Sequence, residues 1–448
     1  MPITGPSRRT PASELDVADR IDAQPVGAFQ VRVFACCLAV SLLDGLDLQA
    51  MGLAAPALIR EWHVPPAAFA TVFSAAPAGM IAGALIFGRL ADQLGRKRLI
   101  VVATIVFGGC TMLTPLTSTL GQLAALRFVT GLGLGGVIPN LTSLVTEFAP
   151  RRLRGTLTTL ALSGLPFGSM VAGLLAAWLI PAYGWPSLFY VGGLLPVAIG
   201  LVALATLPES IRFLALRGDQ AAAVAILRRL APGETIPDDV RLTLPEASGV
   251  AVSFARLFGP ARTATTLLLA LVVALDLFMV YLMLNWLPTL MNSAGFSSEY
   301  ALLASVIVNT GGGIGAVTWG VLLDRFGGFR VMRGAGLAAC AALTVLGLGH
   351  REPALALSAL FLAGACTMGA APGLYAVIAS VYPTAIRSTG AGLVLGVGRI
   401  GSVLGPAAGG LLLSLKWSVP AIFAAVGLPG LVWAAAMWWI LRLPRNFR

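Results

Sequence analysis

Long apolar stretches recur along most of this chain, and they limit its fold more than any other feature. Such a stretch crosses a bilayer as a helix when it has about 20 residues, at about 1.5 Å of rise per residue. Of the 448 residues, 57% are hydrophobic and 11% are charged, against about 25% charged residues in soluble domains. A membrane β-barrel would instead show alternating segments of about 10 residues. The sequence therefore predicts an all-α membrane protein.

Twelve predicted spans fall into two sets of six. The first set covers 31–59, 67–91, 99–117, 121–146, 156–180 and 187–207, and the second covers 263–291, 299–323, 331–349, 354–381, 389–414 and 418–441. The polar stretch between the sets contains one segment, 219–230, that could form an amphipathic helix. The predicted organisation is a tail (1–30), a six-helix bundle (31–207), a linker (208–261), a second six-helix bundle (262–441) and a tail (442–448).

The basic residues predict the orientation of the chain in the membrane. Of 30 Lys and Arg, three lie in alternate loops and two lie well inside spans. The remaining 25 lie in the tails, in the other loops or at the span ends next to those loops. Loops rich in Lys and Arg stay in the cytoplasm. We therefore expect both termini and the linker to be cytoplasmic, in a bacterial-type inner membrane. The net charge of +11 is then a topology signal rather than a sign of nucleic-acid binding, and basic loops meet anionic lipid head groups.

The two sets of spans resemble each other in sequence. "GRLADQLGRKR" (88–98) is echoed by "GVLLDRFGGFR" (320–330), and "LGGVIPNLTSLVTEFAPRRLRGT" (134–156) by "MGAAPGLYAVIASVYPTAIRSTG" (368–390). Duplicated halves around a site near the middle of the membrane are the architecture of secondary transporters. The repeat therefore predicts two pseudo-symmetric bundles that move against each other.

Five charged residues lie well inside the predicted spans: Asp44, Asp47, Arg127, Asp276 and Arg399. A charge at the bilayer centre costs about 2.5 to 3.5 kcal/mol on insertion scales, so each is a candidate functional residue. The positions that correspond to the two arginines in the other half fall near Leu360 and Gly164. Because the arginines do not repeat, duplicated scaffolding does not explain them.

These residue types suggest how the site would work. Arginine keeps its charge and grips a carboxylate with two hydrogen bonds, so an anionic substrate is the natural ligand. A buried carboxyl can take up or release a proton when its surroundings change. The two histidines, His63 and His350, fall in predicted outward loops, so carboxylates must carry any proton. A permanent ion pair of Asp44 or Asp47 with Arg127 would instead be structural.

The loop after the second span resembles the signature of the major facilitator superfamily. Gly88, Asp92, Gly95, Arg96 and Lys97 match its G-x-x-x-D-x-x-G-R-K pattern, and Gln93 departs from it. The resemblance implies a conformational latch, with a second copy at Asp324 and Arg325; the alternative is a turn whose basic side chains reach the membrane surface. Glu147, at the end of the fourth span, is the expected partner of a loop arginine.

"LLDGLDLQAMGLAAPAL" (42–58) narrows the resemblance to the aromatic acid:proton symporters, whose first helix carries a D-G-x-D motif. "RFVTGLGLGGVIPNLTSLVTE", "PESIRFL", "YLMLNWLPTLM" and "GVGRIGSVLGP" are similar to other segments of that family. The resemblance implies that Asp44 and Asp47 serve uptake and proton coupling, and that Arg127 and Arg399 match charged positions. Asp276 departs from the family, and it could carry a proton or simply form a hydrogen bond to Tyr281 or to a neighbouring helix.

We therefore predict a monomeric importer of an aromatic carboxylate with at least one proton. Arg399 or Arg127 would hold the carboxylate, with Asp44 close by, and Tyr281, Trp286 and Tyr375 could stack on the ring. No cofactor and no metal site are expected.

Four other functions compete with this prediction. A sugar porter shares "PESIRFL", and a proton-driven exporter shares the fold, which does not set direction. The paired aspartates and the two buried arginines favour an anionic substrate over a sugar or an exported drug or metabolite. A receptor would need a signalling domain, and an enzyme would need a nucleophile or metal cluster; neither is evident in the sequence.

Overall fold

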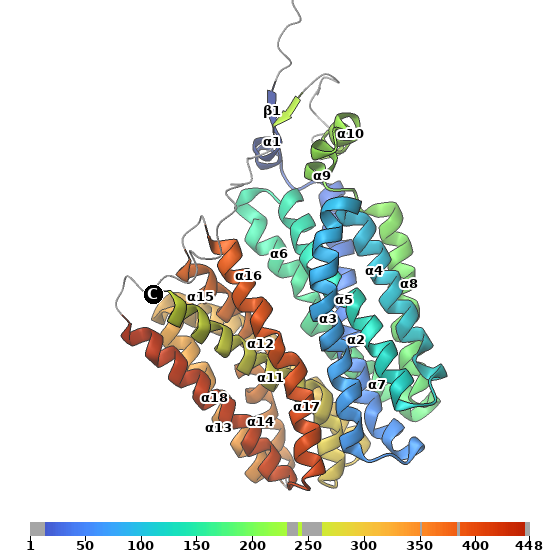
Figure 1. Ribbon diagram of the computed structural model, residues 1–448, viewed down its shortest axis with the longest axis vertical. Helices are drawn as coiled ribbons and strands as arrows, with labels where there is room; N and C mark the ends of the chain where they lie inside the picture. Colours follow the sequence, from blue (N-terminus) through green and yellow to red (C-terminus); the bar gives the residue numbers. More distant parts are fainter. Residues whose placement is uncertain (1–13, 231–240, 244–261, 350–351, 383–385, 444–448) are drawn as a thin grey trace, which may run out of the picture.

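The computed structural model describes residues 14–230, 241–243, 262–349, 352–382 and 386–443. Figure 1 shows two helical bundles side by side, one coloured blue to green and the other yellow to red. Eleven segments of the described chain are long and apolar enough to cross a membrane. The 35-residue helix α2, which carries Asp44 and Asp47, makes the twelfth. The predicted class, an all-α membrane protein of two six-helix bundles, is confirmed.

The first bundle follows the predicted spans closely. Its helices are α2 (Ala28–Trp62), α3 (Phe69–Leu94), α4 (Arg96–Leu113), α5 (Leu120–Phe148), α6 (Arg154–Leu162), α7 (Gly164–Tyr183) and α8 (Pro186–Thr206). Short 3₁₀ turns precede α3, follow α4 and precede α6, as η1 (Pro66–Ala68), η2 (Thr114–Leu116) and η3 (Arg151–Leu153).

The second bundle contains α11 (Thr263–Ser293), α12 (Ser298–Phe326), α13 (Gly328–Gly349), α14 (Pro353–Cys366), α15 (Ala371–Val381), α16 (Arg387–Gly398), α17 (Ile400–Ser414) and α18 (Val419–Arg442). Three predicted spans are interrupted rather than continuous. The span 156–180 breaks at Ser163, 354–381 breaks between Cys366 and Ala371, and 389–414 breaks at Arg399. The fifth crossing of both bundles is thus broken, at corresponding places in the repeat.

A small region lies outside the bundles. The predicted N-terminal tail contains β1 (Glu14–Asp16) and α1 (Val17–Ala23), and β1 pairs in parallel with β2 (Arg241–Thr243) of the linker. The linker also forms α9 (Ile211–Leu216) and α10 (Gln220–Leu230), so the predicted amphipathic segment 219–230 is a helix. Residues 231–240 and 244–261 of the linker lie outside the described residues.

Glycines bring helices of each bundle into backbone contact. A Cβ added to Gly131 of α5 would lie 2.0 Å from the carbonyl oxygen of Ala76 in α3. One added to Gly401 of α17 would lie 1.8 Å from the oxygen of Ala274 in α11. Small residues at such crossings let helices pack without a hydrophobic driving force between them.

The two bundles touch at the end of the molecule away from the linker. Ser74 Oγ donates to the Val403 carbonyl oxygen at 2.9 Å, and the rings of Phe73 and Trp286 meet edge to face at 4.8 Å. The bundles diverge toward the end that carries β1, α1, α9 and α10 (Figure 1). The bundles therefore contact each other at one end of the structure and lie farther apart at the other (Figure 1).

Candidate functional site

The buried polar centre of the first bundle is an ion pair between α2 and α5. Arg127 donates from Nη1 to Asp47 Oδ1 at 3.2 Å and from Nη2 to Oδ2 at 3.0 Å. Thr111 of α4 adds a hydrogen bond to Oδ1 at 2.5 Å. Arg127 is 2% exposed and Asp47 is fully buried. Because each partner satisfies the other, Arg127 is not available to a substrate anion in this conformation.

Asp44 lies one helical turn before Asp47 and has a different environment. Its side chain is fully buried, and neither carboxyl oxygen has a hydrogen-bond partner among the described residues. Asp47 on the same helix and Arg399 of the other bundle both act on it electrostatically. An isolated buried charge is costly, so this carboxyl is poised to take a proton.

Arg399 lies at the break between α16 and α17, where the chain leaves regular helical hydrogen bonding. It is partly buried, and its guanidinium makes no hydrogen bond or ion pair with any other described residue. Its charge acts on Asp44, Tyr281 and Tyr375. Interrupted membrane helices mark binding sites in secondary transporters. Among the described residues of this centre, Arg399 is the cation whose side chain has no partner.

The three predicted aromatic residues differ in their accessibility. Tyr375 of α15 is 46% exposed. Tyr281 of α11 is partly buried, and its hydroxyl lies 3.8 Å from Met80 Sδ of α3. Trp286 is fully buried, and its Nε1 donates to the Pro406 carbonyl oxygen at 2.9 Å. Tyr375 is thus the most accessible of the three to a ligand in this conformation.

Asp276 of α11 is 2% exposed, and its Oδ1 has no hydrogen-bond partner among the described residues. It acts electrostatically on Tyr375. The hydrogen bond to Tyr281 that the sequence left open is not formed: the one hydrogen bond of the Tyr281 hydroxyl within the described chain goes to Met80. The role of Asp276 in proton coupling stays a prediction.

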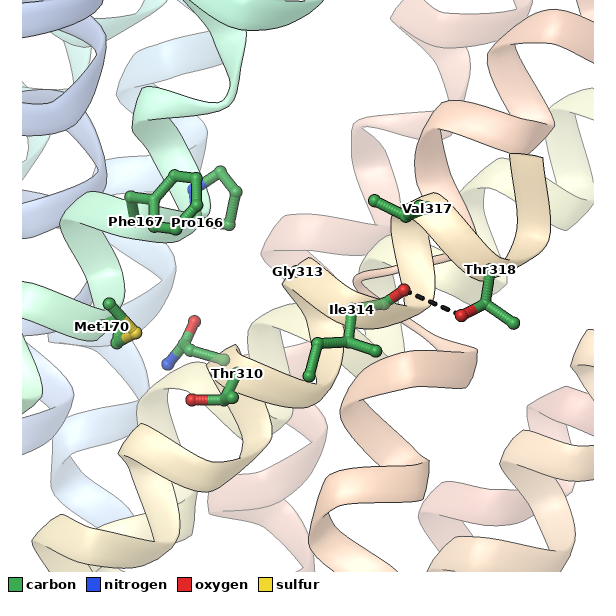
Figure 2. Close-up of a pocket in the computed structure, with 9 residues that line it drawn as sticks. Pro166, Phe167, Met170, Thr310, Gly313, Ile314, Val317 and Thr318 are labelled. Carbon is green, nitrogen blue, oxygen red and sulfur yellow. Dashed lines mark hydrogen bonds between the residues drawn. The ribbon is translucent and has the colours of Figure 1, made fainter. Parts of the chain in front are cut away.

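A cavity of about 420 Å³ separates the bundles between α7 and α12. Figure 2 shows Phe167 and Met170 of α7 on one side and Ile314 and Val317 of α12 on the other. Asn309 also lines it. The lining is largely apolar, which suits an aromatic molecule, and the cavity lies where the bundles begin to part.

Two amide side chains join the bundles beside this cavity. Gln49 of α2 donates to the Leu284 carbonyl oxygen at 3.4 Å, and Asn309 of α12 donates to Gln49 Oε1 at 3.5 Å. Both hydrogen bonds are long and therefore weak. The sequence analysis missed these two residues, although an amide inside an apolar span was a visible signal. Within the described residues, this contact between the bundles contains no ion pair.

The predicted latch is formed in the first bundle. Arg96 donates from Nη1 to Glu147 Oε2 at 2.8 Å, so the expected partner of Glu147 is the arginine of the signature loop. Glu147 also accepts hydrogen bonds from Ser210 Oγ at 2.8 Å and from the Arg212 backbone N–H at 2.8 Å. The latch therefore ties α4, α5 and the start of α9 together.

Glu209 is a latch residue that the sequence analysis did not single out. Its Oε1 accepts from the backbone N–H groups of Arg96 at 2.8 Å and Lys97 at 3.1 Å, at the N-terminus of α4. A carboxylate is favoured there by the helix dipole. Gly95 has φ +95°, and a Cβ on it would lie 2.3 Å from Glu209 Oε2, so this motif glycine is required. The signal was the acidic residue of "PESIRFL".

Four other predicted latch residues have no such contacts. Gly88, Asp92, Asp324 and Arg325 are exposed, and no hydrogen bond or ion pair joins the three charged side chains to other residues that the structure describes. Lys97 contributes its backbone rather than its ammonium group. Latch roles for these side chains stay predictions. No cluster of three or more His, Cys, Asp or Glu in the described chain could hold a metal ion.

Comparison with known proteins places the chain in a family. The Major Facilitator Superfamily profile matches residues 37–345 and 266–447. The 4-hydroxybenzoate transporter PcaK of Pseudomonas aeruginosa is 39% identical over 95% of this chain and 96% of its own length. The gallate transporter of Pseudomonas putida is 37% identical over 94% of each chain. The benzoate transport protein of Acinetobacter baylyi is 34% identical over 94% of this chain and 91% of its own.

Solved structures show the same architecture. The crystal structure of a D-xylose-proton symporter superposes with a TM-score of 0.73, covering 94% of this chain and 99% of that one at 16% identity. The crystal structure of a bacterial homolog of the human lysosomal transporter Spinster, in an inward-facing conformation, superposes with a TM-score of 0.71. The match covers 95% of this chain and 99% of that one, at 17% identity. At such identity the likeness concerns the fold alone. Together with the profile and the relatives, it shows that this chain is a multi-pass membrane transporter, not an enzyme, and belongs to the aromatic-acid branch of the major facilitator superfamily.

Proposed function

We propose that the protein imports an aromatic carboxylate together with at least one proton. One observation carries the proposal: Asp44 of the first bundle and Arg399 of the second interact electrostatically, and neither side chain has a hydrogen-bond or ion-pair partner among the described residues. A cation without a partner can hold a carboxylate, and a buried carboxyl without a partner can hold a proton. The relatives named for 4-hydroxybenzoate, gallate and benzoate support the substrate class.

In this proposal Arg399 binds the substrate carboxylate through its planar fork. The side chains of Tyr375 and Tyr281 contact the aromatic ring of the substrate. Trp286 holds α11 against α17. Asp44 takes a proton on the outside and releases it inside. Asp47 stays paired with Arg127 in the first bundle and biases Asp44 toward its neutral form, because two carboxylates on one helix turn repel. Asp276 is a second candidate proton carrier.

The proposed orientation places both termini and the linker in the cytoplasm of a bacterial inner membrane. The distribution of Lys and Arg supports it. The end at which the bundles diverge, which carries α9 and α10, is then the cytoplasmic end. In this proposal, substrate and proton leave the protein from this state. We also propose that one chain works alone and that its basic loops contact anionic lipid.

Uptake into proteoliposomes tests the proposal. Purified protein is offered radiolabelled 4-hydroxybenzoate, benzoate and gallate, with and without an inward proton gradient, alongside xylose and a cationic dye. We expect one or more acids to accumulate above equilibrium with the gradient and only to equilibrate without it. Accumulation of xylose alone would support a sugar porter, and extrusion of the dye would support an exporter; either result would contradict the proposal.

A further inference from the structure

Three glycines among the described residues meet the opposite bundle, toward the end of the molecule away from the linker (the contact end). They are Gly52 of α2, Gly173 of α7 and Gly410 of α17. For the other glycines of the described bundle helices, the nearest atoms to an added Cβ, where any lie within 4 Å, belong to the glycine's own bundle. The three glycines therefore shape the seams between the bundles rather than the packing inside either one.

Each of the three helix pairs that form the main contacts between the bundles contains one of these glycines. The pairs are α2 with α11, α3 with α17, and α7 with α12. Helices α7 and α17 are the second segments of the broken fifth crossing in each bundle, so Gly173 and Gly410 lie in corresponding helices of the repeat. Close approach is thus a property of the whole interface rather than of one crossing.

At the seam of α2 with α11, a proline leaves a carbonyl group free for the other bundle. Pro288 lies inside α11 and has no N–H, so the Leu284 carbonyl lacks its usual helical donor one turn later. Gln49 Nε2 of α2 donates to this oxygen at 3.4 Å. A Cβ on Gly52 would lie 2.3 Å from the same oxygen. Alanine at this position would therefore push α2 and α11 apart and break the hydrogen bond.

The other two seams differ in how tightly they are packed. A Cβ on Gly410 would lie 2.3 Å from the Ala70 Cβ, which is fixed to the α3 backbone. One on Gly173 would lie 2.7 Å from Val306 Cγ2, and the nearest backbone atom is 3.7 Å away. A single methyl group can be displaced with its side chain, whereas a backbone cannot. A side chain should therefore cost more at Gly52 and Gly410 than at Gly173.

Close packing must supply much of the attraction between the bundles at this end. Within the described residues no ion pair joins them, and the hydrogen bond of Ser74 to Val403 is accompanied by the long one of Gln49. Between membrane helices, van der Waals contact is a main source of attraction, and small residues permit it. Because dispersion falls steeply with distance, a gap as wide as a methyl group removes much of this attraction.

We propose that Gly52, Gly173 and Gly410 form a gate between the bundles that closes only in the absence of side chains at these positions. They set the balance between the state described here and one in which the bundles part at the contact end. A Cβ at any of them lies between the bundles, so it leaves each bundle intact and penalises the closed gate alone. Such an equilibrium shifts by the difference in free energy that a change makes between the two states. The gate does not depend on which substrate the protein carries.

Distances between two spin labels across the contact end test the gate. The labels are attached at Ser118→Cys, between α4 and α5, and at Ser414→Cys, at the end of α17, in a chain whose five native cysteines are replaced by alanine. Both serines are exposed. Gly52→Ala and Gly410→Ala should each raise the ratio of long to short distances at least about tenfold over the labelled parent, and Gly173→Ala should raise it less. Alanine favours a helix more than glycine does, so helix propensity does not oppose these changes.

Two further glycines separate gating from folding. Gly45 lies on the same helix as Gly52, but its Cβ would lie 1.9 Å from the Leu165 carbonyl oxygen, inside the first bundle. Gly45→Ala should therefore lower the melting temperature without adding a population of long distances. Gly109 has open space around it, so Gly109→Ala should change neither the melting temperature nor the distances.

Folded Gly52→Ala and Gly410→Ala variants with the distances of the labelled parent would overturn the proposal. Failure of both to fold, as Gly45→Ala could, would also overturn it, because the contacts would then belong to the core of the fold. Should the chain without cysteines not fold, hydrogen exchange of the chain with its native cysteines decides. Exchange in Gly52→Ala should then become faster in η1, at the contact end of α3, and slower at the other end of α3. Faster exchange at both ends, or no change at either, would contradict the gate.

Discussion

Arg127 grips Asp47 with both of its terminal nitrogens, at 3.2 Å and 3.0 Å, inside the first bundle. Asp44, one turn earlier on the same helix, has no such partner among the described residues. The two aspartates of one motif therefore differ in chemistry: one is held by a fixed cation and the other is free to titrate. We therefore assign a structural role to the Asp47–Arg127 ion pair and the role of proton carrier to Asp44.

Breaking the ion pair should destabilise the protein strongly. Arg127→Leu leaves Asp47 as an uncompensated buried charge, and removing one partner of a buried pair costs about 3 to 5 kcal/mol. We expect a clear loss of stability in chemical unfolding of the detergent-purified protein. The double variant Arg127→Leu with Asp47→Leu should recover much of the loss, because no charge is then left unpaired. A double variant as unstable as the single one would show that the cost lies in packing instead.

Arg399 should control recognition of the substrate charge. Arg399→Gln keeps hydrogen-bonding capacity but loses the charge and the fork, so the affinity for an aromatic acid should fall about 10- to 100-fold, as for the loss of a charge-assisted pair of about 1.5 to 3 kcal/mol. Competition against radiolabelled 4-hydroxybenzoate measures this. The uncharged amide of the same acid is the control ligand, and its weak binding should not change. Equal losses for acid and amide would argue against a carboxylate contact.

The close crossing of α11 and α17 should tolerate no side chain at Gly401. Gly401→Val adds atoms where a Cβ already lies 1.8 Å from the Ala274 carbonyl oxygen, so the helices that carry Tyr281 and Arg399 must separate. We expect low yield of folded protein and loss of uptake. The matched control is Gly396→Ala, at a glycine with open space around it. A folded, active Gly401→Val variant would contradict the packing described.

The ion pair between Arg96 and Glu147 in the latch can be tested by removing its negative charge. Glu147→Gln keeps the shape of the side chain but removes the charge that pairs with Arg96. The Glu147 side chain is 14% exposed and accepts several hydrogen bonds, so the loss of stability should be about 1 to 3 kcal/mol. If the pair controls opening, exchange of external for internal substrate should slow or speed several-fold at unchanged affinity. An unchanged exchange rate would leave the pair without a role in the transport cycle.

Much of the fold could be predicted from the sequence because bilayer thickness sets the length of each apolar run. The twelve spans and the amphipathic segment near Gln220 follow from length and periodicity alone. The breaks at Ser163 and Arg399 could not be predicted in this way, since glycine-rich apolar runs fit a continuous and an interrupted helix equally well. The pairing of β1 with β2 joins residues more than 200 positions apart, and no local pattern indicates it.

The site was predicted as a set of residues rather than as an arrangement. The cost of burying charge identified Asp44, Asp47, Arg127, Asp276 and Arg399, and the signature loop identified Arg96. Which aspartate pairs with which arginine depends on helix rotation and crossing, which spacing does not determine. Glu209 and Gln49 were missed for a related reason: their roles depend on partners in distant segments, at the start of α4 and in α12.

The most direct test of the account is whether protons enter with the substrate through Asp44. Proteoliposomes with an entrapped pH-sensitive dye receive 4-hydroxybenzoate, and protein-free liposomes correct for passive entry of the neutral acid. The account predicts that the wild type acidifies the lumen above this background. It also predicts that Asp44→Asn exchanges internal for external substrate without moving protons. Acidification by Asp44→Asn at the wild-type rate would contradict the assignment of Asp44 as the proton carrier.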